Sequence, residues 1–273
     1  MAFTFDFKNK NILVVGGTSG INRGIAETFA RAGARVAVAS RSPEKVDDTV
    51  QSLKKLGALD ALGFSADVRE AEAIKAGIDH VAATWGKFDV VISGAAGNFP
   101  ALAMGMSPKG FRSVIEIDLL GTFHVMQSIY PHLKKPGASI INISAPQAEI
   151  PMAGQSHVCA AKAGVDMITR TLCIEWGAEG VRINSIIPGP IDNTEGMKRL
   201  APTEGLRSAV TKSVPLQRMG STDDIANACL FLASDFASYI SGAVIPVDGG
   251  WAQGGAAVVG ASLAEMLKAA PRS

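Results

Sequence analysis

Short apolar runs alternate along the chain with longer segments in which apolar and polar positions recur at helical spacing. Seven runs have the length and composition of strands: residues 11–16, 34–40, 61–67, 88–94, 138–144, 181–187 and 242–248. Because most of their positions are apolar, these runs are typical of strands buried on both faces of a sheet. Helical patterns separate them, and this order predicts an α/β fold with a doubly wound parallel sheet.

Local signals mark the ends of the first two helices. The first is expected from about Gly20 to Ala32. For the second, Ser42 is a good N-cap, Pro43 suits the first helical position, and Gly57 suits the stop.

The organisation predicts a single domain over residues 1–273, because no low-complexity linker divides the chain. Its core is expected over 8–250, followed by a Gly- and Ala-rich tail, 251–273, to which the sequence assigns no role. Residues 191–215 break the strand–helix rhythm, being polar and helical in places. This segment is either a mobile lid over a site or an ordinary surface excursion.

Composition excludes several function classes. The net charge of +1 gives no strong attraction to nucleic acid or to a membrane surface, so neither is expected as a partner. Three Cys without paired or metal-like spacing are typical of reduced thiols in an intracellular protein. The first residues lack the apolar run of a signal peptide, and the final residues are not a peroxisomal address. We therefore expect a cytoplasmic protein, and no metal site, since His124 and His132 have no acidic cluster near them in sequence.

A Gly-rich turn follows the first strand and leads into the first helix, in "VVGGTSGINRG". Glycines let the backbone turn tightly beside a diphosphate, and the helix N-terminus offers free N–H groups and a favourable dipole. This position between strand and helix predicts a nucleotide site. The residues expected to contact the cofactor here are Gly16, Thr18, Ser19, Gly20 and Ile21.

The spacing of this turn, and the order of the later motifs over Lys8 to Gly250, resemble the short-chain dehydrogenase/reductase family. The resemblance implies a Rossmann-type fold, a nicotinamide cofactor and a homo-oligomer, a tetramer by family habit. Asn22 stands at the family's third Gly, and we expect the turn to survive because Asn tolerates left-handed backbone. The further cofactor contacts implied by the family are Asp67, Val68, Ala95, Ala96, Gly97, Lys162, Pro188, Gly189 and Ile191.

The end of the second strand favours NADP(H) over NAD(H). An acidic residue there would accept a hydrogen bond from the ribose 2′-hydroxyl and repel a 2′-phosphate. This chain has Ser40 and Arg41, which can donate to a phosphate. The alternative is that Arg41 is only a solvated loop cation.

The family's catalytic Ser, Tyr and Asn are replaced. Ala145 stands at the Ser position, Val158 at the Tyr position and Asp118 at the Asn position, while Lys162 remains. Ser144 is expected to point to the other face of its strand end. A ketone reductase without the usual acid would lose roughly 10²–10⁴-fold in rate. The chain is therefore either a binding protein without chemistry or an enzyme whose reaction makes no alkoxide.

A closer resemblance favours such an enzyme. The segments "SGAAGNFPA", "DLLGTF", "GPIDNTEGMKRL" and "PLQRMG" resemble the 2,4-dienoyl-CoA reductases, particularly the peroxisomal type, which also lacks this Tyr and Ser. The mitochondrial type has a Tyr where Gln147 stands here. The resemblance implies NADPH-dependent reduction of an acyl-CoA-type substrate, a conjugated dienoyl thioester, to a 3-enoyl-CoA.

The resemblance and the chemistry together suggest roles for the site residues. Lys162 anchors the cofactor ribose, and Asp118 orients a proton-carrying water, as the two catalytic residues. The expected substrate contacts are Asn98, Phe99, Gln147 and His157. Each has a plainer alternative: Asp118 pairs with Lys162 only as structure, Phe99 belongs to the core, and His157 is an ordinary satisfied histidine.

Two other functions stay open at this stage. One is a ketoreductase acting on another acyl thioester or carbonyl compound. The other is an inert NADP-binding scaffold or sensor. Basic residues of the 191–215 segment suit the phosphates of CoA, although they are equally compatible with solvated charges: Lys198, Arg199, Arg207 and Lys212.

Overall fold

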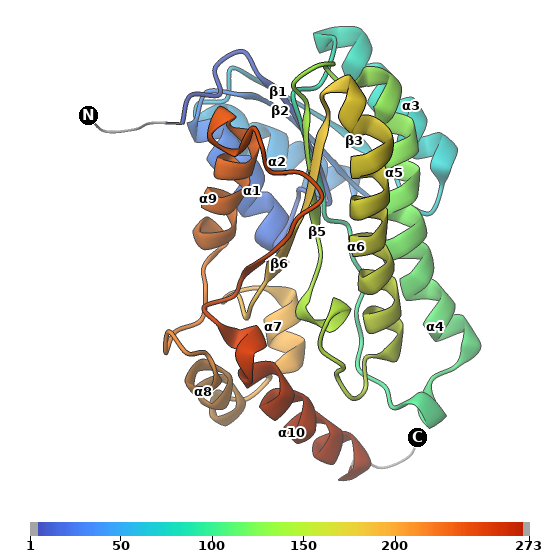
Figure 1. Cartoon of the computed structure of the whole chain (residues 1–273), viewed down its shortest axis with the longest axis vertical. Coiled ribbons are helices and arrows are strands. Elements are labelled where there is room, and N and C mark those ends of the chain that lie inside the picture. Colours follow the sequence, from blue (N-terminus) through green and yellow to red (C-terminus); the bar gives the residue numbers. More distant parts are fainter. Residues whose placement is uncertain (1–4, 270–273) are drawn as a thin grey trace.

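The computed structural model describes residues 5–269 of the chain. Within this range seven strands form one sheet, all parallel, in the order β3-β2-β1-β4-β5-β6-β7. The strands are β1 Asn11–Val15, β2 Arg35–Ser40, β3 Asp60–Ser65, β4 Val90–Ser93, β5 Ser139–Ile143, β6 Arg182–Pro188 and β7 Val244–Val247. The predicted doubly wound α/β fold is confirmed, with helices on both sides of the sheet (Figure 1).

The helices flank the sheet in two layers. The main ones are α1 Gly20–Arg31, α2 Pro43–Lys55, α3 Ala71–Trp85, α4 Pro108–Val114, α5 Gly121–Ile129, α6 Ser156–Trp176 and α9 Thr222–Ala233. One apolar core lies between the sheet and α1, α2 and α9, and the other between the sheet and α3, α5 and α6. Ser42 caps α2 by accepting from the amide of Lys45, as the sequence indicated.

Strand order reverses at β1. Ile12 of β1 pairs with Val36 of β2 on one side and with Val90 of β4 on the other. Chain crossovers leave β1 in opposite directions at this point, so a crevice opens at the carboxyl ends of the strands. The fold therefore places the Gly-rich turn after β1 at the natural ligand site of such sheets.

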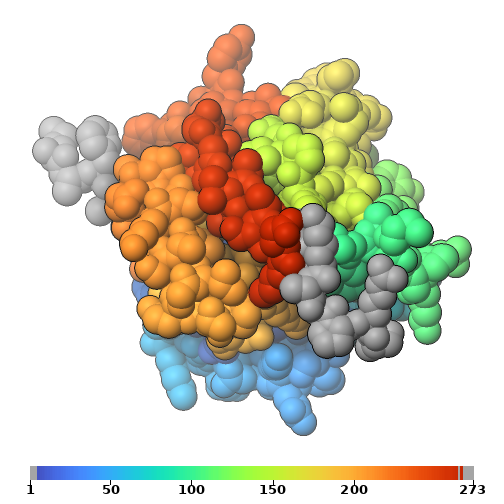
Figure 2. All heavy atoms as spheres, turned by 90° about the horizontal axis from the view of Figure 1, so that it is seen from below, coloured from blue at the N-terminus to red at the C-terminus, as the bar shows by residue number. Residues whose placement is uncertain are grey.

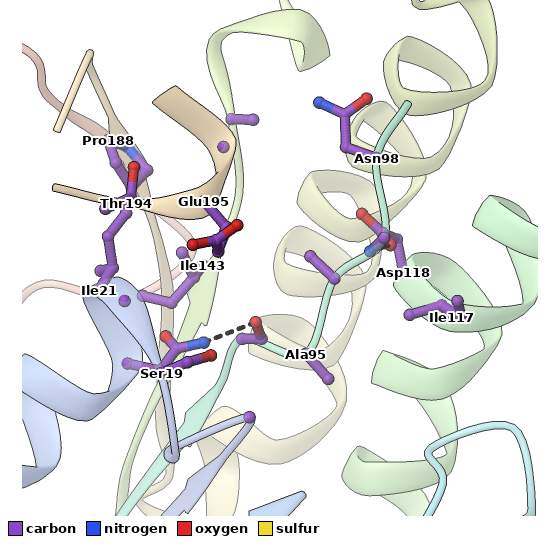
Figure 3. A pocket seen from close by; sticks show the side chains of 18 of the residues that line it. Ser19, Ile21, Ala95, Asn98, Ile117, Asp118, Ile143, Pro188, Thr194 and Glu195 are labelled. Carbon is purple, nitrogen blue, oxygen red and sulfur yellow. Dashed lines mark hydrogen bonds between the residues drawn. The ribbon is translucent and has the colours of Figure 1, made fainter. Parts of the chain in front are cut away.

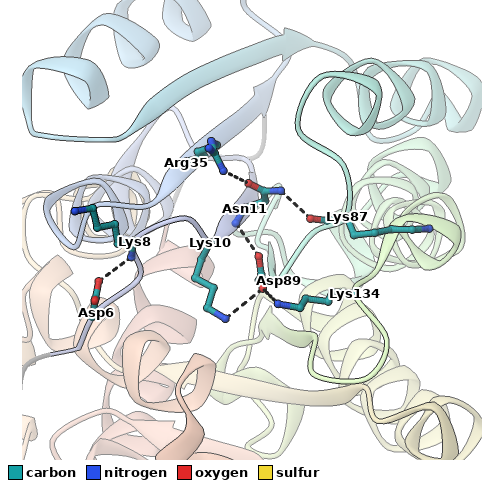
Figure 4. Close-up of polar contacts among 8 residues, drawn as sticks. All are labelled: Asp6, Lys8, Lys10, Asn11, Arg35, Lys87, Asp89 and Lys134. Atoms are coloured by element: carbon teal, nitrogen blue, oxygen red, sulfur yellow. Dashed lines mark hydrogen bonds and ion pairs between the residues drawn. The ribbon is translucent and has the colours of Figure 1, made fainter.

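Polar contacts around Asp89 join the amino ends of the strands, at the end of the sheet opposite the crevice (Figure 4). Its carboxylate accepts from the amide of Asn11 at 2.9 Å and pairs with Lys134 at 3.0 Å and Lys10 at 3.4 Å. The Asn11 side chain donates to the carbonyl of Lys87 at 2.8 Å. These contacts fix the starts of β1 and β4 relative to each other.

Full burial on both faces does not extend to β7. Every residue of β7 is at least partly exposed, whereas β1, β4 and β5 are buried throughout. The reason is position, because β7 is the edge of the sheet and has one strand neighbour where β1 has two.

The segment 191–215 and the tail pack on each other. The segment contains α7 Glu195–Leu200 and α8 Glu204–Ser213, and the tail contains α10 Gly255–Ala269. Met197, Val210 and Val214 form one apolar cluster with Trp251 and Val259. In Figure 2 the red α10 lies between this orange segment and the yellow-green chain near residue 150.

Candidate active site

A cavity of about 520 Å³ opens at the carboxyl ends of the strands. Figure 3 shows Ser19 and Ile21 on one wall, Asp118 and Asn98 on the opposite wall, and Glu195 between them. Of the sequence-predicted site residues, all but Phe99 and His157 line it: Gly16, Thr18, Ser19, Gly20, Ile21, Ser40, Arg41, Asp67, Val68, Ala95, Ala96, Gly97, Asn98, Asp118, Gln147, Lys162, Pro188, Gly189 and Ile191.

The Gly-rich turn forms a cradle with free backbone donors. Gly16 has φ +80°, and a Cβ there would lie 3.0 Å from the amide of Ala95, so a side chain is excluded. Gly20 has φ +52° and opens α1. The side chain of Ser19, the N-cap residue, makes no capping hydrogen bond, so the first amides of α1 remain available to an anion.

The turn survives with Asn22 as expected, but the expected reason is wrong, because Asn22 does not sit in left-handed backbone. The left-handed residue is Gly20, and Asn22 is part of α1. Its Nδ2 donates to the carbonyl of Gly94 at 2.7 Å. The side chain thereby braces the turn after β1 against the turn after β4, which explains how a larger residue replaces the third Gly.

Basic and hydroxyl groups gather at the end of β2. Ser40, Arg41, Ser42 and Lys45 all line the cavity. Neither Arg41 nor Lys45 forms an ion pair within residues 5–269, and the buried Oγ of Ser40 has no partner there. Unpaired donors of this kind fit a phosphate group, and β2 itself ends in Ser40, followed by Arg41, without an acidic residue.

Asp118 and Lys162 form a buried pair. Lys162 Nζ lies 3.3 Å from Asp118 Oδ2 and donates to the carbonyl of Ile143 at 3.0 Å. Asp118 Oδ1 accepts from the amide of Gly97 at 2.7 Å. Asp118 lies in a π-helical turn, η2 Ile115–Leu120, between α4 and α5. Such turns recur at functional sites, and this one aims the carboxylate at α6.

No phenol lies near this pair. Val158 is buried against Val114 and Ala161 and also lines the cavity, as does Ala145. The chain has two Tyr, and neither lines the cavity. Tyr130 donates to Glu179, and the Tyr239 side chain is fully exposed. The usual acid of the family is thus absent in space as well as in sequence.

Amide side chains line a further part of the cavity. Gln147 lies in η4 Pro146–Ala148, and its Nε2 donates to Gln155 Oε1 at 2.7 Å. The buried oxygens Gln147 Oε1 and Asn98 Oδ1 have no hydrogen-bond partner among the described residues. Apolar residues that line the same cavity nearby are Val158, Met197, Leu200 and Trp251.

Phe99 and His157, two of the expected substrate contacts, do not line the cavity. Their rings meet edge to face with centroids 4.6 Å apart, and His157 is fully buried. Burial lowers the pKa of His157, an effect that the backbone groups of Phe99 and Gln155 oppose. In this arrangement His157 supports the loop that carries Asn98 and does not face a ligand itself.

A buried polar cluster lies one helical turn beyond Lys162. Asp166 sits among Ser144 and Ser185, and burial raises the pKa of its carboxyl despite these hydroxyls. The Ser144 hydroxyl lies beside Asp166, although Ser144 also lines the cavity next to Ala145. The raised pKa favours the neutral form of Asp166, which suits its position between α6 and the sheet.

Several cavity residues carried no recognisable signal in sequence. They are Lys45, Gln155 and Trp251, whereas Thr194, Glu195, Met197 and Leu200 lie in the segment 191–215, which the sequence offers as a possible lid. Trp251 is the clearest example, because it follows the last strand in a tail without motif. Its Nε1 donates to Ser213 Oγ at 2.9 Å at the end of α8, so the tail helps to wall the site.

Among the described residues, neither a metal-binding cluster nor a membrane-spanning helix is found. No three His, Cys, Asp or Glu side chains there are grouped so that they could hold a metal ion. No helix there is long and apolar enough to cross a membrane.

Taken together, the parallel sheet and the cradle at its switch point define a doubly wound α/β protein with a candidate nucleotide site. The family model described as enoyl-(acyl carrier protein) reductase matches residues 15–252. The chain therefore belongs to the short-chain dehydrogenase/reductase family, as its sequence indicated.

Relatives and solved structures are similar over most of the chain. A Danio rerio protein named peroxisomal 2,4-dienoyl-CoA reductase, (3E)-enoyl-CoA-producing, is 42% identical over 87% of this chain and 79% of its own. A Bacillus subtilis protein named probable 2,4-dienoyl-CoA reductase, (2E)-enoyl-CoA-producing, is 39% identical over 89% and 96%. The Pseudomonas aeruginosa RhlG/NADP active-site complex has a TM-score of 0.85 at 25% identity, covering 92% of this chain and 100% of its own.

Proposed function

We propose that this oxidoreductase reduces a conjugated 2,4-dienoyl-CoA thioester to a 3-enoyl-CoA with NADPH. The observation that carries the proposal is the cavity in which Asp118 and Lys162 form a buried pair while Val158 and Ala145 replace the phenol and hydroxyl. The names of the relatives from Danio rerio and Bacillus subtilis support the substrate class.

The residues present fit an NADP(H) cofactor. The cradle of Gly16 and Gly20 and the free amides of α1 would hold the diphosphate. Ser40, Arg41 and Lys45 would hold a 2′-phosphate. A bound nicotinamide supplies the hydride. Lys162 keeps donor capacity for a ribose hydroxyl beyond its two present partners, since an ammonium has three N–H groups.

The proposed reaction needs no acid beside a carbinol. Hydride adds to Cδ of the dienoyl group, the two C=C π pairs each shift one bond toward the thioester, and the carbonyl π pair moves onto the oxygen, which gives a dienolate. A proton then returns to Cα, which leaves the double bond between Cβ and Cγ. Asp118, fixed by the amide of Gly97 and by Lys162, holds the water that delivers this proton.

The segment 191–215 is proposed as a lid over the substrate. Ile191, Thr194, Met197 and Leu200 line the cavity, which an ordinary surface excursion would not do. Arg199 is held by donating to the carbonyl of Asn98 at 2.9 Å, which joins this segment to the opposite wall. Of its other basic side chains, Lys198 pairs with Glu195 and Arg207 with Asp192.

Oligomer and location stay predictions. Large apolar side chains are exposed on η2, α5 and α6, which supports association through these helices into the proposed homotetramer: Leu120, Phe123, Met167 and Ile174. For location, the Bacillus relative agrees with a cytoplasmic protein, whereas the names of the eukaryotic relatives place those proteins in peroxisomes.

The alternative functions have less support. A ketoreductase needs a proton donor beside the new alkoxide, and neither Val158 nor Ala145 supplies one. A pure scaffold has no need of a carboxylate and a lysine paired inside a ligand cavity.

The test is NADPH oxidation with a 2,4-dienoyl-CoA and, separately, with a 3-oxoacyl-CoA, using the wild type and Lys162→Ala. We expect turnover of the dienoyl thioester only, and its loss in the variant, whose folded state is checked by circular dichroism because Lys162→Ala leaves Asp118 without its buried partner. Reduction of the 3-oxoacyl thioester in preference would replace the proposal with a ketoreductase. NADPH binding without turnover of either compound would refute it.

A further inference from the structure

Gln155 is a cavity residue to which the proposed reaction has so far given no task. It is the N-cap residue of α6, is 3% exposed and lines the cavity. Its backbone is fixed on both sides, because its amide donates to Met152 and its carbonyl accepts from Cys159. The backbone from which this side chain projects is therefore fixed before any ligand binds.

The Gln147–Gln155 contact uses the side-chain oxygen of Gln155 and leaves its amide nitrogen without an acceptor. Gln147 Nε2 is committed to Gln155 Oε1 at 2.7 Å and also faces the sulfur of Met152 at 3.7 Å. Gln155 Nε2 has no acceptor among residues 5–269. Protein atoms do not enclose it completely, so it is open to the cavity that Gln155 lines. Its oxygen is held from behind, which leaves its N–H groups facing inward.

The surroundings strengthen such a donor. Val158, one helical turn further along α6, and the apolar side chains of Met197 and Trp251 line the same cavity. Apolar walls exclude water and increase the energy of a hydrogen bond to a developing anion. The N-terminus of the 21-residue α6 adds a favourable dipole for negative charge.

We propose that Gln155 Nε2 donates a hydrogen bond to the thioester oxygen and stabilises the dienolate, and that Gln147 positions Gln155. This inference rests on the proposed function. It makes Gln155 a catalytic residue of the substrate end, distinct in role from Asp118 and Lys162, which serve the proton and the ribose. The negative charge that forms on the oxygen meets a neutral donor fixed in advance, so little reorganisation is needed in the reaction.

The kinetic test compares Gln155→Ala, Gln147→Ala and the exposed control Gln51→Ala on α2. A donor used mainly in the transition state lowers kcat more than it raises KM, so Gln155→Ala should lose about 10²–10³-fold in kcat. Gln147→Ala should lose less, and NADPH affinity should stay within about threefold in all three. An undiminished kcat in Gln155→Ala, or a larger loss in Gln147→Ala, overturns the assignment.

A second variant separates donation from packing. Gln155→Glu keeps the size but presents an acceptor at neutral pH, so its kcat should be low there. It should recover as the pH falls and the new carboxyl becomes protonated, a limb that the wild type lacks. A flat pH profile in Gln155→Glu overturns the donor role.

A binding measurement makes the inference independent of turnover. A dienoyl thioester absorbs in the near ultraviolet, and a hydrogen bond to its oxygen moves the band to longer wavelength. In complexes with NADP⁺ the wild type should show this shift and Gln155→Ala should lose it. An equal shift in both overturns the inference alone. A Gln155-dependent shift without turnover supports it and refutes the proposed reaction, and no binding by the wild type refutes both.

Discussion

At the scale of single residues, the site keeps the family's Lys162 but has other residues at the positions of the family's Ser, Tyr and Asn. Asp118 and Lys162 are 1% and 5% exposed, so each depends on the other for the charge that it buries. Removing one partner of a buried pair typically costs about 3–5 kcal/mol. Asp118→Ala would therefore confound stability with catalysis, whereas Asp118→Asn retains the acceptor for the Gly97 amide.

Arg41 gives the residue-scale prediction about the cofactor. Its guanidinium is exposed at the end of β2 and forms no ion pair in the described part of the chain. Arg41→Ala should weaken NADPH binding by about tenfold, the effect of losing one charge-assisted hydrogen bond of roughly 1.5 kcal/mol. NADH binding should change little, because it has no 2′-phosphate.

The measurement is the dissociation constant of each reduced cofactor by fluorescence titration, with Arg31→Ala on the outer end of α1 as the matched control. An unchanged ratio of the two constants in Arg41→Ala would show that the 2′-phosphate is read elsewhere, with Lys45 as the next candidate.

At the scale of elements, α6 carries several of the residues of the site and its surroundings. Gln155 caps it, and Val158, Lys162 and Asp166 follow at spacings of three or four residues, which places them on one face. The sequence could predict this helix and the position of Lys162. It could not predict that the stretch around Asp118 is a π turn, because the apolar spacing there is that of an ordinary helix.

The tail was the element least readable from sequence. Nothing in a Gly- and Ala-rich segment predicts a ligand, and Trp251 gains its place only through contacts with α8, which lies far away in the chain. The same holds for Asn22, whose partner is a carbonyl 72 residues later. Contacts of this kind depend on the register of packed elements, which local patterns do not encode.

The Trp251–Ser213 hydrogen bond supplies the element-scale prediction. If α8 and the tail close the site as one unit, Trp251→Phe and Ser213→Ala should each raise KM for the dienoyl-CoA by about fivefold, the effect of one neutral hydrogen bond of about 1 kcal/mol. The double variant should be no worse than either single variant, since both remove the same bond. Steady-state KM values of the four proteins test this, and additive effects would show that the two residues act separately.

At the scale of the whole molecule, the fold was the part best predicted from sequence. Seven apolar runs became seven parallel strands, and the turn after the first lies where strand order reverses. Burial of both faces holds for the central strands and fails at β7, since an edge strand has only one strand neighbour. What the fold leaves open is where the proton goes, which depends on a few side chains in one cavity.

The relatives make this the central question, because their names give two different products, a (3E)- and a (2E)-enoyl-CoA. Protonation of the dienolate at Cα gives the 3-enoyl thioester, and protonation at Cγ gives the 2-enoyl thioester. A water held by Asp118 and Lys162, with Gln155 on the thioester oxygen, places the proton source at the thioester end and favours Cα.

The most direct measurement is the structure of the product formed from a 2,4-dienoyl-CoA and NADPH in D₂O, determined by NMR, with Asp118→Asn alongside. The account predicts a 3-enoyl-CoA that carries one solvent deuterium at Cα, formed more slowly by the variant. A 2-enoyl-CoA with deuterium at Cγ would contradict the placement of the water. A wild type that forms no reduced thioester would contradict the reaction itself.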